Sequence, residues 1–241
     1  MNNAIYVALS RQTGVERQLS VVANNLANAN TTGFNGDQLL FKSHLVPDAG
    51  GRTTAFVEDV ATIRTTTQGR LEYTGNPLDL AINGKGYFAV TGPAGVTAYT
   101  RAGNFVLDSE GSLSTIDGYK VQDDGGSQID FQEDDREIKI FGDGRIEVDG
   151  EERGNIGFYQ FADEQKLKRI GGNMYAALTA PIPNEGEGRI AQGMIEKSNV
   201  APVTEITNLI QLQRAYTGNA KFISDMYELQ ETAIRKLSAQ S

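Results

Sequence analysis

The chain has 241 residues, enough for one large domain or two small ones, and its 39% hydrophobic and 22% charged residues are typical of a folded protein. No apolar run reaches the roughly 18–20 residues of a membrane helix, and no basic region followed by an apolar block opens the sequence. We therefore expect neither a membrane span nor a cleaved secretory signal. Cysteine is absent, which excludes disulfides, thiolate catalysis and cysteine metal sites.

The net charge of −9 is concentrated in one stretch, because residues 123–152 hold twelve acidic and three basic side chains while the rest of the chain is balanced. Non-specific nucleic-acid binding requires a basic face, so we expect no nucleic-acid partner. We expect the acidic side chains to lie in solvated turns and on exposed strand faces. They are Asp123, Asp124, Asp130, Glu133, Asp134, Asp135, Glu137, Asp143, Glu147, Asp149, Glu151 and Glu152.

Apolar side chains near the N-terminus recur in steps of three and four, which places them on one face of a helix. The pattern predicts a helix over residues 3–28, roughly 39 Å long at 1.5 Å per residue. One glutamine interrupts the face, and its amide would penalise a shifted pairing with another helix. The positions are Ile5, Ala8, Gln12, Val15, Leu19, Val22 and Leu26.

The C-terminal segment repeats the pattern and predicts a second helix over residues 202–238, with Pro202 in its first turn. Its main positions are Ile206, Leu209, Gln213, Tyr216, Ala220, Ile223, Tyr227, Gln230, Ile234 and Leu237. A second stripe consists of Val203, Ile210, Phe222, Met226, Leu229 and Ala233. We expect the two helices to pair as a coiled coil, and the wide apolar face of the second helix to pack against other subunits as well.

The middle of the chain is rich in short β-prone runs, at residues 77–82, 86–90, 104–107, 138–141, 145–148 and 156–161. Asp-Gly pairs at 117–118, 124–125, 143–144 and 149–150 favour tight turns between strands. Strands spaced by about 8–12 residues predict an antiparallel sandwich or barrel. Residues 35–70 are rich in threonine and predict an extended arm or a long hairpin.

These patterns predict an α+β fold, in which paired terminal helices enclose an extended arm and an inserted antiparallel β domain. We expect four parts: an N-terminal helix (1–32), an arm or hairpin (33–70), a β-rich domain (71–195) and a C-terminal helix (196–241). The two helices would form the two halves of one coiled-coil domain.

Residues suited to catalysis or metal binding are scarce. His44 is the only histidine, and with no cysteine a catalytic triad or a zinc site is not indicated. Asp134 and Asp135 are adjacent and would point to opposite faces of a strand, which does not suit paired acid–base catalysis; Asp130 and Glu147 stay open as more distant partners. The glycine-rich segments 83–88 and 142–150 lack the strand–loop–helix context of a phosphate-binding loop and indicate turns. We expect no cofactor, no metal and no small-molecule substrate.

Four blocks of the sequence resemble the rod and hook family of bacterial flagellar axial proteins. They are "NNLANANTTGF" (24–34), "GRLEYTGNPLDLAINGKGYFAV" (69–90), "YTRAGNFVLDSEGSL" (99–113) and "EKSNVAPVTEITNLIQLQRAYTGNAKFI" (196–223). The blocks occur in the family's order and cover both ends and the start of the middle. Within the family the likeness favours the proximal-rod member, with the distal-rod member as the alternative.

The resemblance implies a structural protein and not an enzyme. It implies a subunit that leaves the cytoplasm through the flagellar type III export apparatus and polymerises, with copies of itself and other rod proteins, into a helical tube across the periplasm. An alternative of a different class is a secreted carbohydrate-binding or carbohydrate-active β protein.

By the same resemblance, one set of residues forms the junction between the helix and the arm: Asn24, Asn25, Leu26, Ala27, Asn28, Asn30, Thr31, Gly33 and Phe34. Ser198, Asn199, Val200 and Arg214 belong to the C-terminal signature. Asn35 and Gly36 stand where the family often has a basic residue. The four asparagines exceed what a helix C-cap needs, so we expect them to hydrogen-bond across subunits. Assembly would use Ile5, Val15, Leu19, Val22, Leu26, Ile206, Leu209, Gln213, Tyr216, Ile223 and Tyr227.

Overall fold

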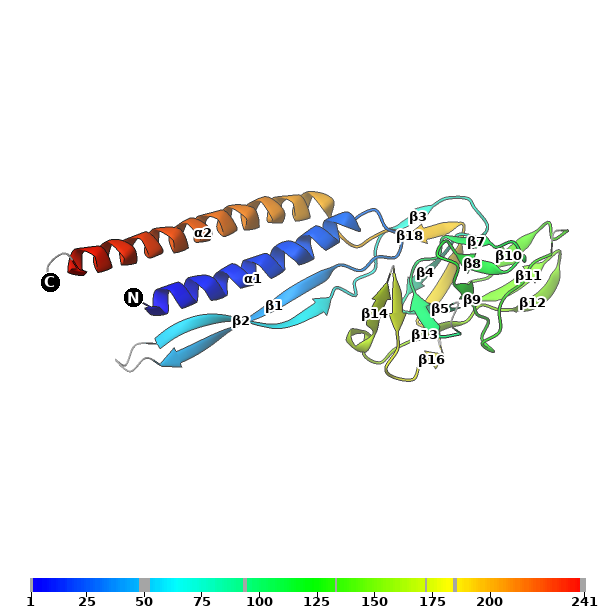
Figure 1. Ribbon diagram of the computed structural model, residues 1–241. Helices are drawn as coiled ribbons and strands as arrows, with labels where there is room; N and C mark the ends of the chain where they lie inside the picture. The colour runs from blue at the N-terminus through cyan, green and yellow to red at the C-terminus, as the bar shows by residue number, and fades with distance from the viewer. Residues whose placement is uncertain are drawn as a thin grey trace. The chain divides into compact units, whose positions relative to one another are not determined.

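The computed structural model describes residues 2–47, 53–92, 95–132, 134–171, 173–183 and 186–238 (Figure 1). The chain divides into two compact units. Unit 1 comprises Met1–Ala27, Asp37–Arg64 and Ala201–Ser241, and unit 2 comprises Asn28–Gly36 and Thr65–Val200. The chain therefore passes between the units four times.

Unit 1 consists of two long helices and a β-hairpin: α1 (Asn2–Ala27), β1 (Asp37–Pro47), β2 (Thr53–Arg64) and α2 (Pro202–Ser238). The helices run side by side in opposite directions (Figure 1). Asn219 of α2 donates hydrogen bonds to the carbonyl of Ala8 (2.8 Å) and to the side-chain oxygen of Gln12 (2.9 Å) in α1. The hairpin packs along α1 and carries a bulge at Leu40 and Phe41.

Unit 2 is built from short strands and one turn of 3₁₀ helix, η1 (Glu164–Lys166). Its strands are β3 (Leu71–Tyr73), β4 (Leu80–Gly84), β5 (Tyr87–Thr91), β6 (Thr97–Thr100), β7 (Phe105–Leu107), β8 (Leu113–Thr115), β9 (Lys120–Val121), β10 (Ile138–Ile140), β11 (Arg145–Val148), β12 (Glu151–Asn155), β13 (Phe158–Gln160), β14 (Lys168–Gly171), β15 (Met174–Ala176), β16 (Ile182–Pro183), β17 (Gly188–Gln192) and β18 (Met194–Glu196).

The largest sheet of unit 2 has nine strands, in the order β14-β15-β6-β5-β9-β8-β7, with β13 added to β5 and β16 to β13. Strands β10, β11 and β12 form a three-stranded sheet, while β17 pairs with β4 and β18 pairs with β3. Each of these pairs is antiparallel. The expected antiparallel β region is therefore confirmed.

Strand β5 is buried on both faces because side chains alternate along a strand. Phe88 and Val90 lie in a large apolar cluster, whereas Tyr87 and Ala89 lie in a smaller, mainly aromatic cluster on the other face. The hydroxyl of Tyr87 donates to Glu164 over 2.9 Å, and burial together with this carboxylate raises the pKa of Tyr87. The centre of unit 2 thus has a core on each side of one sheet.

The long elements match the expectations closely, and the short ones match in part. The predicted helices and the hairpin are present, but the strand expected at 77–82 begins only at Leu80. Residues 76–79 turn instead, because the side chain of Asn76 accepts from the Leu78 amide and the Asn76 carbonyl accepts from the Asp79 amide. Among the four Asp-Gly pairs, Gly118, Gly144 and Gly150 have the positive φ that tight turns need.

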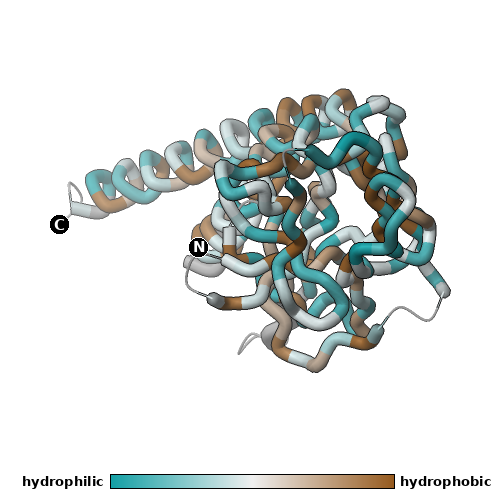
Figure 2. The backbone as a smooth tube through the Cα atoms, turned by 90° about the vertical axis from the view of Figure 1, so that its right-hand side faces the viewer, coloured by the Kyte–Doolittle hydropathy of each residue, from teal (hydrophilic) through white to brown (hydrophobic). Residues whose placement is uncertain are grey.

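None of the helices in the described part of the chain is long and apolar enough to cross a membrane. Hydropathy drawn along the backbone shows apolar positions recurring along α2, interrupted by polar ones (Figure 2). A helix of this kind buries part of its surface against a partner and leaves the rest available.

Candidate junction and assembly surface

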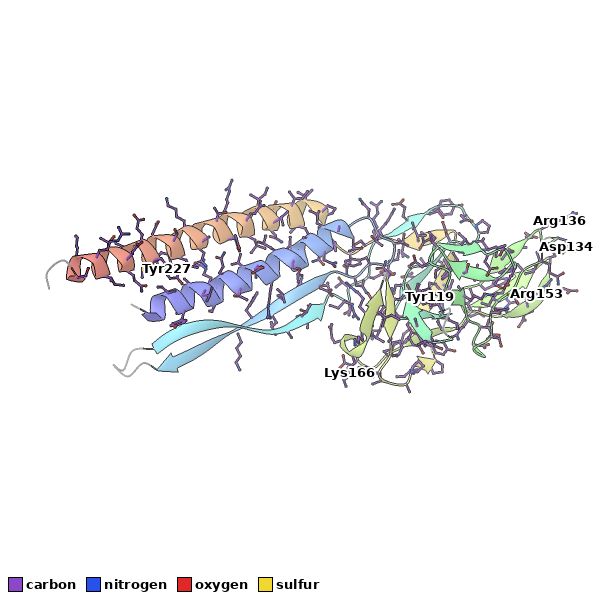
Figure 3. All side chains as sticks on the ribbon, in the orientation of Figure 1. Tyr119, Asp134, Arg136, Arg153, Lys166 and Tyr227 are labelled. Carbon is purple, nitrogen blue, oxygen red and sulfur yellow. The ribbon has the colours of Figure 1, made fainter. Side chains whose placement is uncertain are left out.

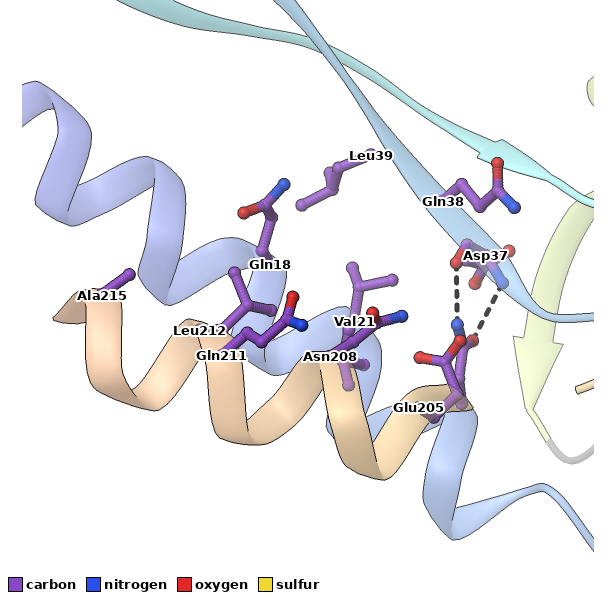
Figure 4. A pocket seen from close by; sticks show the side chains of 12 residues that line it. Gln18, Val21, Asp37, Gln38, Leu39, Glu205, Asn208, Gln211, Leu212 and Ala215 are labelled. Atoms are coloured by element: carbon purple, nitrogen blue, oxygen red, sulfur yellow. Dashed lines mark hydrogen bonds between the residues drawn. The ribbon is translucent and has the colours of Figure 1, made fainter. Parts of the chain in front are cut away.

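Asn25 fixes the last turn of α1 to the first residue of β1. Its amide nitrogen donates to the carbonyl of Asp37 and its amide oxygen accepts from the Asp37 backbone N–H, both over 2.9 Å (Figure 4). Asn25 is buried, and each polar group of its side chain has a partner within unit 1. This use within the chain differs from the use across subunits that we expected for all four asparagines.

The other asparagines of the signature lie nearer the surface. Asn28 is half-buried, and its side-chain oxygen accepts from the Thr31 hydroxyl while its carbonyl accepts from the Thr31 amide, which closes the turn after α1. Asn24 and Asn30 are exposed. Leu26 is half-buried and Ala27 is exposed at the end of α1.

Gly33 occupies a position in unit 2 where no other residue fits. Its φ is +66°, and a Cβ added there would lie 2.4 Å from the backbone nitrogen of Ala102. Its amide donates to the carbonyl of Glu196 over 2.7 Å, so the chain leaving α1 is held against the strand that precedes α2. Glycine alone combines this backbone angle with such a close approach.

Phe34 and Asn35 are both buried beside Arg169. The guanidinium carbon of Arg169 lies 4.7 Å from the centre of the Phe34 ring, and the group donates to the Asn35 carbonyl over 2.7 Å. Asn173 donates in the same region to the carbonyl of Thr32. A positive charge therefore reaches this segment from β14, although position 35 itself is not basic.

Asn199 joins three segments of unit 2 at the places where the chain enters or leaves it. Its side-chain nitrogen donates to the carbonyls of Thr65 (2.8 Å) and Thr67 (2.9 Å), and its side-chain oxygen accepts from the Gly36 amide (2.8 Å). Its backbone N–H donates to the carbonyl of Phe34 over 3.2 Å. We call residues 34–36, 65–67 and 199 the joining segments.

A buried ion pair links Arg101 to Glu196 in β18. Arg101 donates to Glu196 over 2.8 Å, with side chains 7% and 1% exposed. The guanidinium also donates to the carbonyls of Gly86 (2.7 Å) and Gly84 (3.0 Å), while the other carboxylate oxygen of Glu196 accepts from the Gly69 amide (2.9 Å). Because each charge has several partners, the pair positions β18 against the turn between β4 and β5.

Several of these residues were not singled out in the sequence. Arg101 and Glu196 lie inside two of the recognised blocks, but charged residues are usually exposed, and no local signal pairs them across 95 positions. Asn219 was missed as well. Its hydrogen bond to Gln12 gives the predicted polar interruption of the α1 face a partner in α2.

The predicted assembly residues divide into two groups in the single chain. Val15 is buried, and Ile5, Leu19, Val22, Leu26, Leu209 and Ile223 are half-buried. Four others are exposed: Ile206, Gln213, Tyr216 and Tyr227. Among the C-terminal signature residues, Ser198 accepts a hydrogen bond from the Val200 amide, and Arg214 is exposed.

A groove in unit 1, which we call the unit 1 groove, lies between α1, β1 and α2 and has a volume of about 510 Å³ (Figure 4). Glu205 and Asp37 lie at one end, and the buried Oε2 of Glu205 has no hydrogen-bond partner among the described residues. The lining residues are Gln18, Val21, Val22, Asn25, Asp37, Gln38, Leu39, Glu205, Asn208, Gln211, Leu212 and Ala215.

The acidic stretch supplies partners for turns. Asp149 accepts from the backbone of Arg136 and Glu137, Asp123 accepts from the Ser127 amide, and Asp135 pairs with Arg153 over 3.1 Å. Asp134 is exposed (Figure 3).

The two candidates for paired catalysis are bonded elsewhere, since Asp130 accepts from the Ser112 hydroxyl and Glu147 lies 3.7 Å from Arg145. Within the described ranges, no three His, Cys, Asp or Glu side chains are grouped as a metal site would need. The side chain of His44 lies outside the described residues.

Three flagellar families match the chain in order. Residues 5–35 match the flagella basal body rod protein family, residues 81–148 the flagellar hook protein FlgE/F/G D1 domain, and residues 191–236 the flagellar basal body rod FlgEFG protein C-terminal domain. These ranges include Asn25, Gly33, Phe34, Arg101, Glu196 and Asn199.

Similar proteins span the whole chain. A flagellar basal-body rod protein FlgF from Caulobacter vibrioides is 40% identical over 98% of both chains, and one from Mesorhizobium japonicum is 36% identical over 100% of both. A flagellar basal-body rod protein FlgG from Bacillus subtilis is 34% identical over 95% of this chain and 97% of its own. The chain therefore belongs to the family of flagellar basal-body rod proteins and is a structural protein, not an enzyme.

Proposed function

We propose that this chain is a subunit of the proximal rod and that it polymerises helically through its terminal helices. The observation that supports this most directly is the apolar surface of α2, where Val203, Ile206, Ile210, Phe222 and Leu229 are at least 45% exposed. Large apolar side chains repeated along one element mark an interaction surface.

The finer features of this proposal follow from the family and from the sequence. The helices pair as a coiled coil, which provides register, and the polar contact between Gln12 and Asn219 opposes slipping. The boundaries at 32, 70 and 195 stay the proposed division along the sequence, although the hairpin packs with the helices in unit 1. Contacts across subunits stay our proposal for Asn24, Asn28 and Asn30, although Asn28 also accepts from Thr31 within the chain.

Location is part of the same proposal. The subunit leaves the cytoplasm through the flagellar type III export apparatus, crosses the periplasm as part of the rod and rotates with it as a drive shaft for motility. By the family resemblance FlgF is the proximal-rod member and FlgG the distal-rod member, and the FlgF relatives, 40% and 36% identical over nearly the whole chain, favour the proximal rod. Copies of this chain and other rod proteins are its neighbours.

Charging the helix face tests this function. Leu209→Asp and Ile223→Asp, each made in the full chain, are expected to abolish incorporation into purified basal bodies and swimming motility, because a carboxylate would be buried between apolar side chains. Leu178→Asp is the matched control, since Leu178 is 76% exposed in unit 2. Normal motility of both helix variants would contradict the proposal.

A further inference from the structure

The chain contains two Asn-Gly pairs, Asn35-Gly36 and Asn83-Gly84. Asparagine followed by glycine is prone to spontaneous deamidation, because no Cβ on the second residue hinders the close approach that the reaction needs. The backbone nitrogen of the glycine attacks the side-chain carbonyl carbon of the asparagine. A C–N bond forms, and the side-chain nitrogen leaves as ammonia with the proton of the glycine N–H. One water then opens the resulting succinimide ring to aspartate or isoaspartate.

At Asn35-Gly36, one side chain restrains both reacting groups. The Gly36 N–H donates to Oδ1 of Asn199 over 2.8 Å, and Nδ2 of Asn199 donates to Oδ1 of Asn35 over 3.4 Å. Arg169 donates to the carbonyl between the two residues over 2.7 Å. Asn35 is also only 2% exposed, which limits the access of the water that completes the reaction. Ring closure is therefore opposed at the nitrogen, at the side chain and at the peptide group between them.

The second pair, Asn83-Gly84, lies at the end of β4 and is restrained at one group only. Asn83 is exposed, and within the described ranges its side chain has no hydrogen-bond partner. The Gly84 N–H donates to Oε1 of Gln68 over 3.1 Å, which corresponds to the contact between Gly36 and Asn199. The attacking nitrogen is thus held at both pairs, whereas the attacked side chain is held at Asn35 alone.

We propose that Asn35 and Asn83 are sites of deamidation in the unfolded chain, and that Asn199 protects Asn35 once the joining segments have formed, while Asn83 stays open to modification. Reaction at Asn35 in the folded chain requires a local opening that breaks three hydrogen bonds, and each bond lowers the open population roughly fivefold. Folding is therefore expected to slow deamidation of Asn35 about a hundredfold or more, and to leave Asn83 at least about tenfold faster than Asn35.

Reaction at Asn35 before folding would alter the joining segments. Isoaspartate routes the backbone through the former side chain and adds one carbon to it directly before Gly36. The Gly36 N–H would then no longer meet Asn199 in the same register as the Thr65 and Thr67 carbonyls do. The protection by Asn199 thus preserves the geometry that Asn199 itself needs.

Peptide mass spectrometry of the purified full chain measures both sites in one sample. The chain is incubated at mildly alkaline pH, in native buffer and in guanidinium chloride, and the deamidated fraction is followed over time. Asn35 is expected to react in the denaturant and to stay intact in native buffer, while Asn83 reacts in both. Equal rates of Asn35 in the two conditions, or a faster reaction of Asn35 than of Asn83 in native buffer, would overturn the proposal.

Two substitutions test the restraining side chains separately. Asn199→Ala is expected to raise deamidation of Asn35 in native buffer about tenfold or more and to leave Asn83 unchanged, because two of the three hydrogen bonds are lost. Gln68→Ala is the matched control and is expected to raise Asn83 only, since it frees the Gly84 N–H. The rate at the other site reports global unfolding in each variant. A folded Asn199→Ala chain with an unchanged rate at Asn35 would show that Asn199 is not the protecting group.

Discussion

Arg101 and Glu196 form a buried ion pair, in which each charge is compensated only as long as its partner is present. Both side chains are more than nine-tenths buried. An isolated buried charge is far more costly than a buried apolar group, whereas a fully bonded pair is close to neutral. The pair therefore specifies one arrangement of β18 more than it adds stability.

Removal of the Glu196 charge tests how far the stability of unit 2 depends on the pair. Glu196→Gln is expected to lower the free energy of unfolding by roughly 3–5 kcal/mol, because the Arg101 guanidinium stays buried without its carboxylate. Glu72→Gln in the neighbouring strand β3 is the control, since its ion pairs with Arg70 and Lys197 are partly exposed and worth at most about 1 kcal/mol. Urea denaturation followed by circular dichroism measures both; equal losses in the two variants would refute this account.

At the scale of elements, the side chain of Asn199 links all of the joining segments through hydrogen bonds. A single side chain contacts the backbone at Gly36, Thr65 and Thr67, so these three segments of unit 2 are held together. A movement of one joining segment must therefore break bonds to the others.

Asn199→Asp replaces the donating amide nitrogen with an oxygen of similar size. It is expected to cost about 2–3 kcal/mol, because two carbonyls lose their donor and face a negative charge. Hydrogen exchange of the amides at Thr65 and Gly36, which are both bonded within this region, should rise in the variant. Asn30→Asp, at an exposed position, should leave exchange unchanged; unaltered protection in Asn199→Asp would contradict the assigned role.

The elements differ in how far their sequence reveals them. Both helices and the hairpin were predictable because their patterns are long and local. Strands β17 and β18 were not, since each pairs with a strand more than 100 residues earlier, as in Ile190 with Ile82 and Glu196 with Leu71. The partner of Arg101 was hidden for the same reason, whereas Gly33, Phe34 and Asn199 were identified through the family motif.

The whole molecule is assembled from discontinuous pieces of chain. Unit 2 needs residues 28–36 as well as 65–200, because Phe34 is buried in it and Gly33 contacts Glu196. A fragment limited to residues 71–195 would lack Phe34, Glu196 and Asn199 while keeping Arg101.

Two fragments test this composition. The amide of Thr65 donates to the carbonyl of Gly36 over 2.8 Å, so a short glycine–serine linker can replace residues 37–64 in a fragment of residues 28–200. That fragment is expected to unfold cooperatively. Residues 71–195 alone are expected to be several kcal/mol less stable, because they retain a buried arginine without its carboxylate. Equal midpoints in urea would show that the added segments do not belong to the folded unit.

The joining segments also set the order in which the fold can be completed. Asn199 contacts residues 134 and 163 positions earlier in the chain, and Arg169 contacts one 134 positions earlier. Such distant contacts close large loops and form late, so they slow folding. In a chain that emerges from a channel N-terminus first, the junction stays open until residue 199 has passed. If the chain is exported as proposed above, the junction becomes rigid only after residue 199 has arrived.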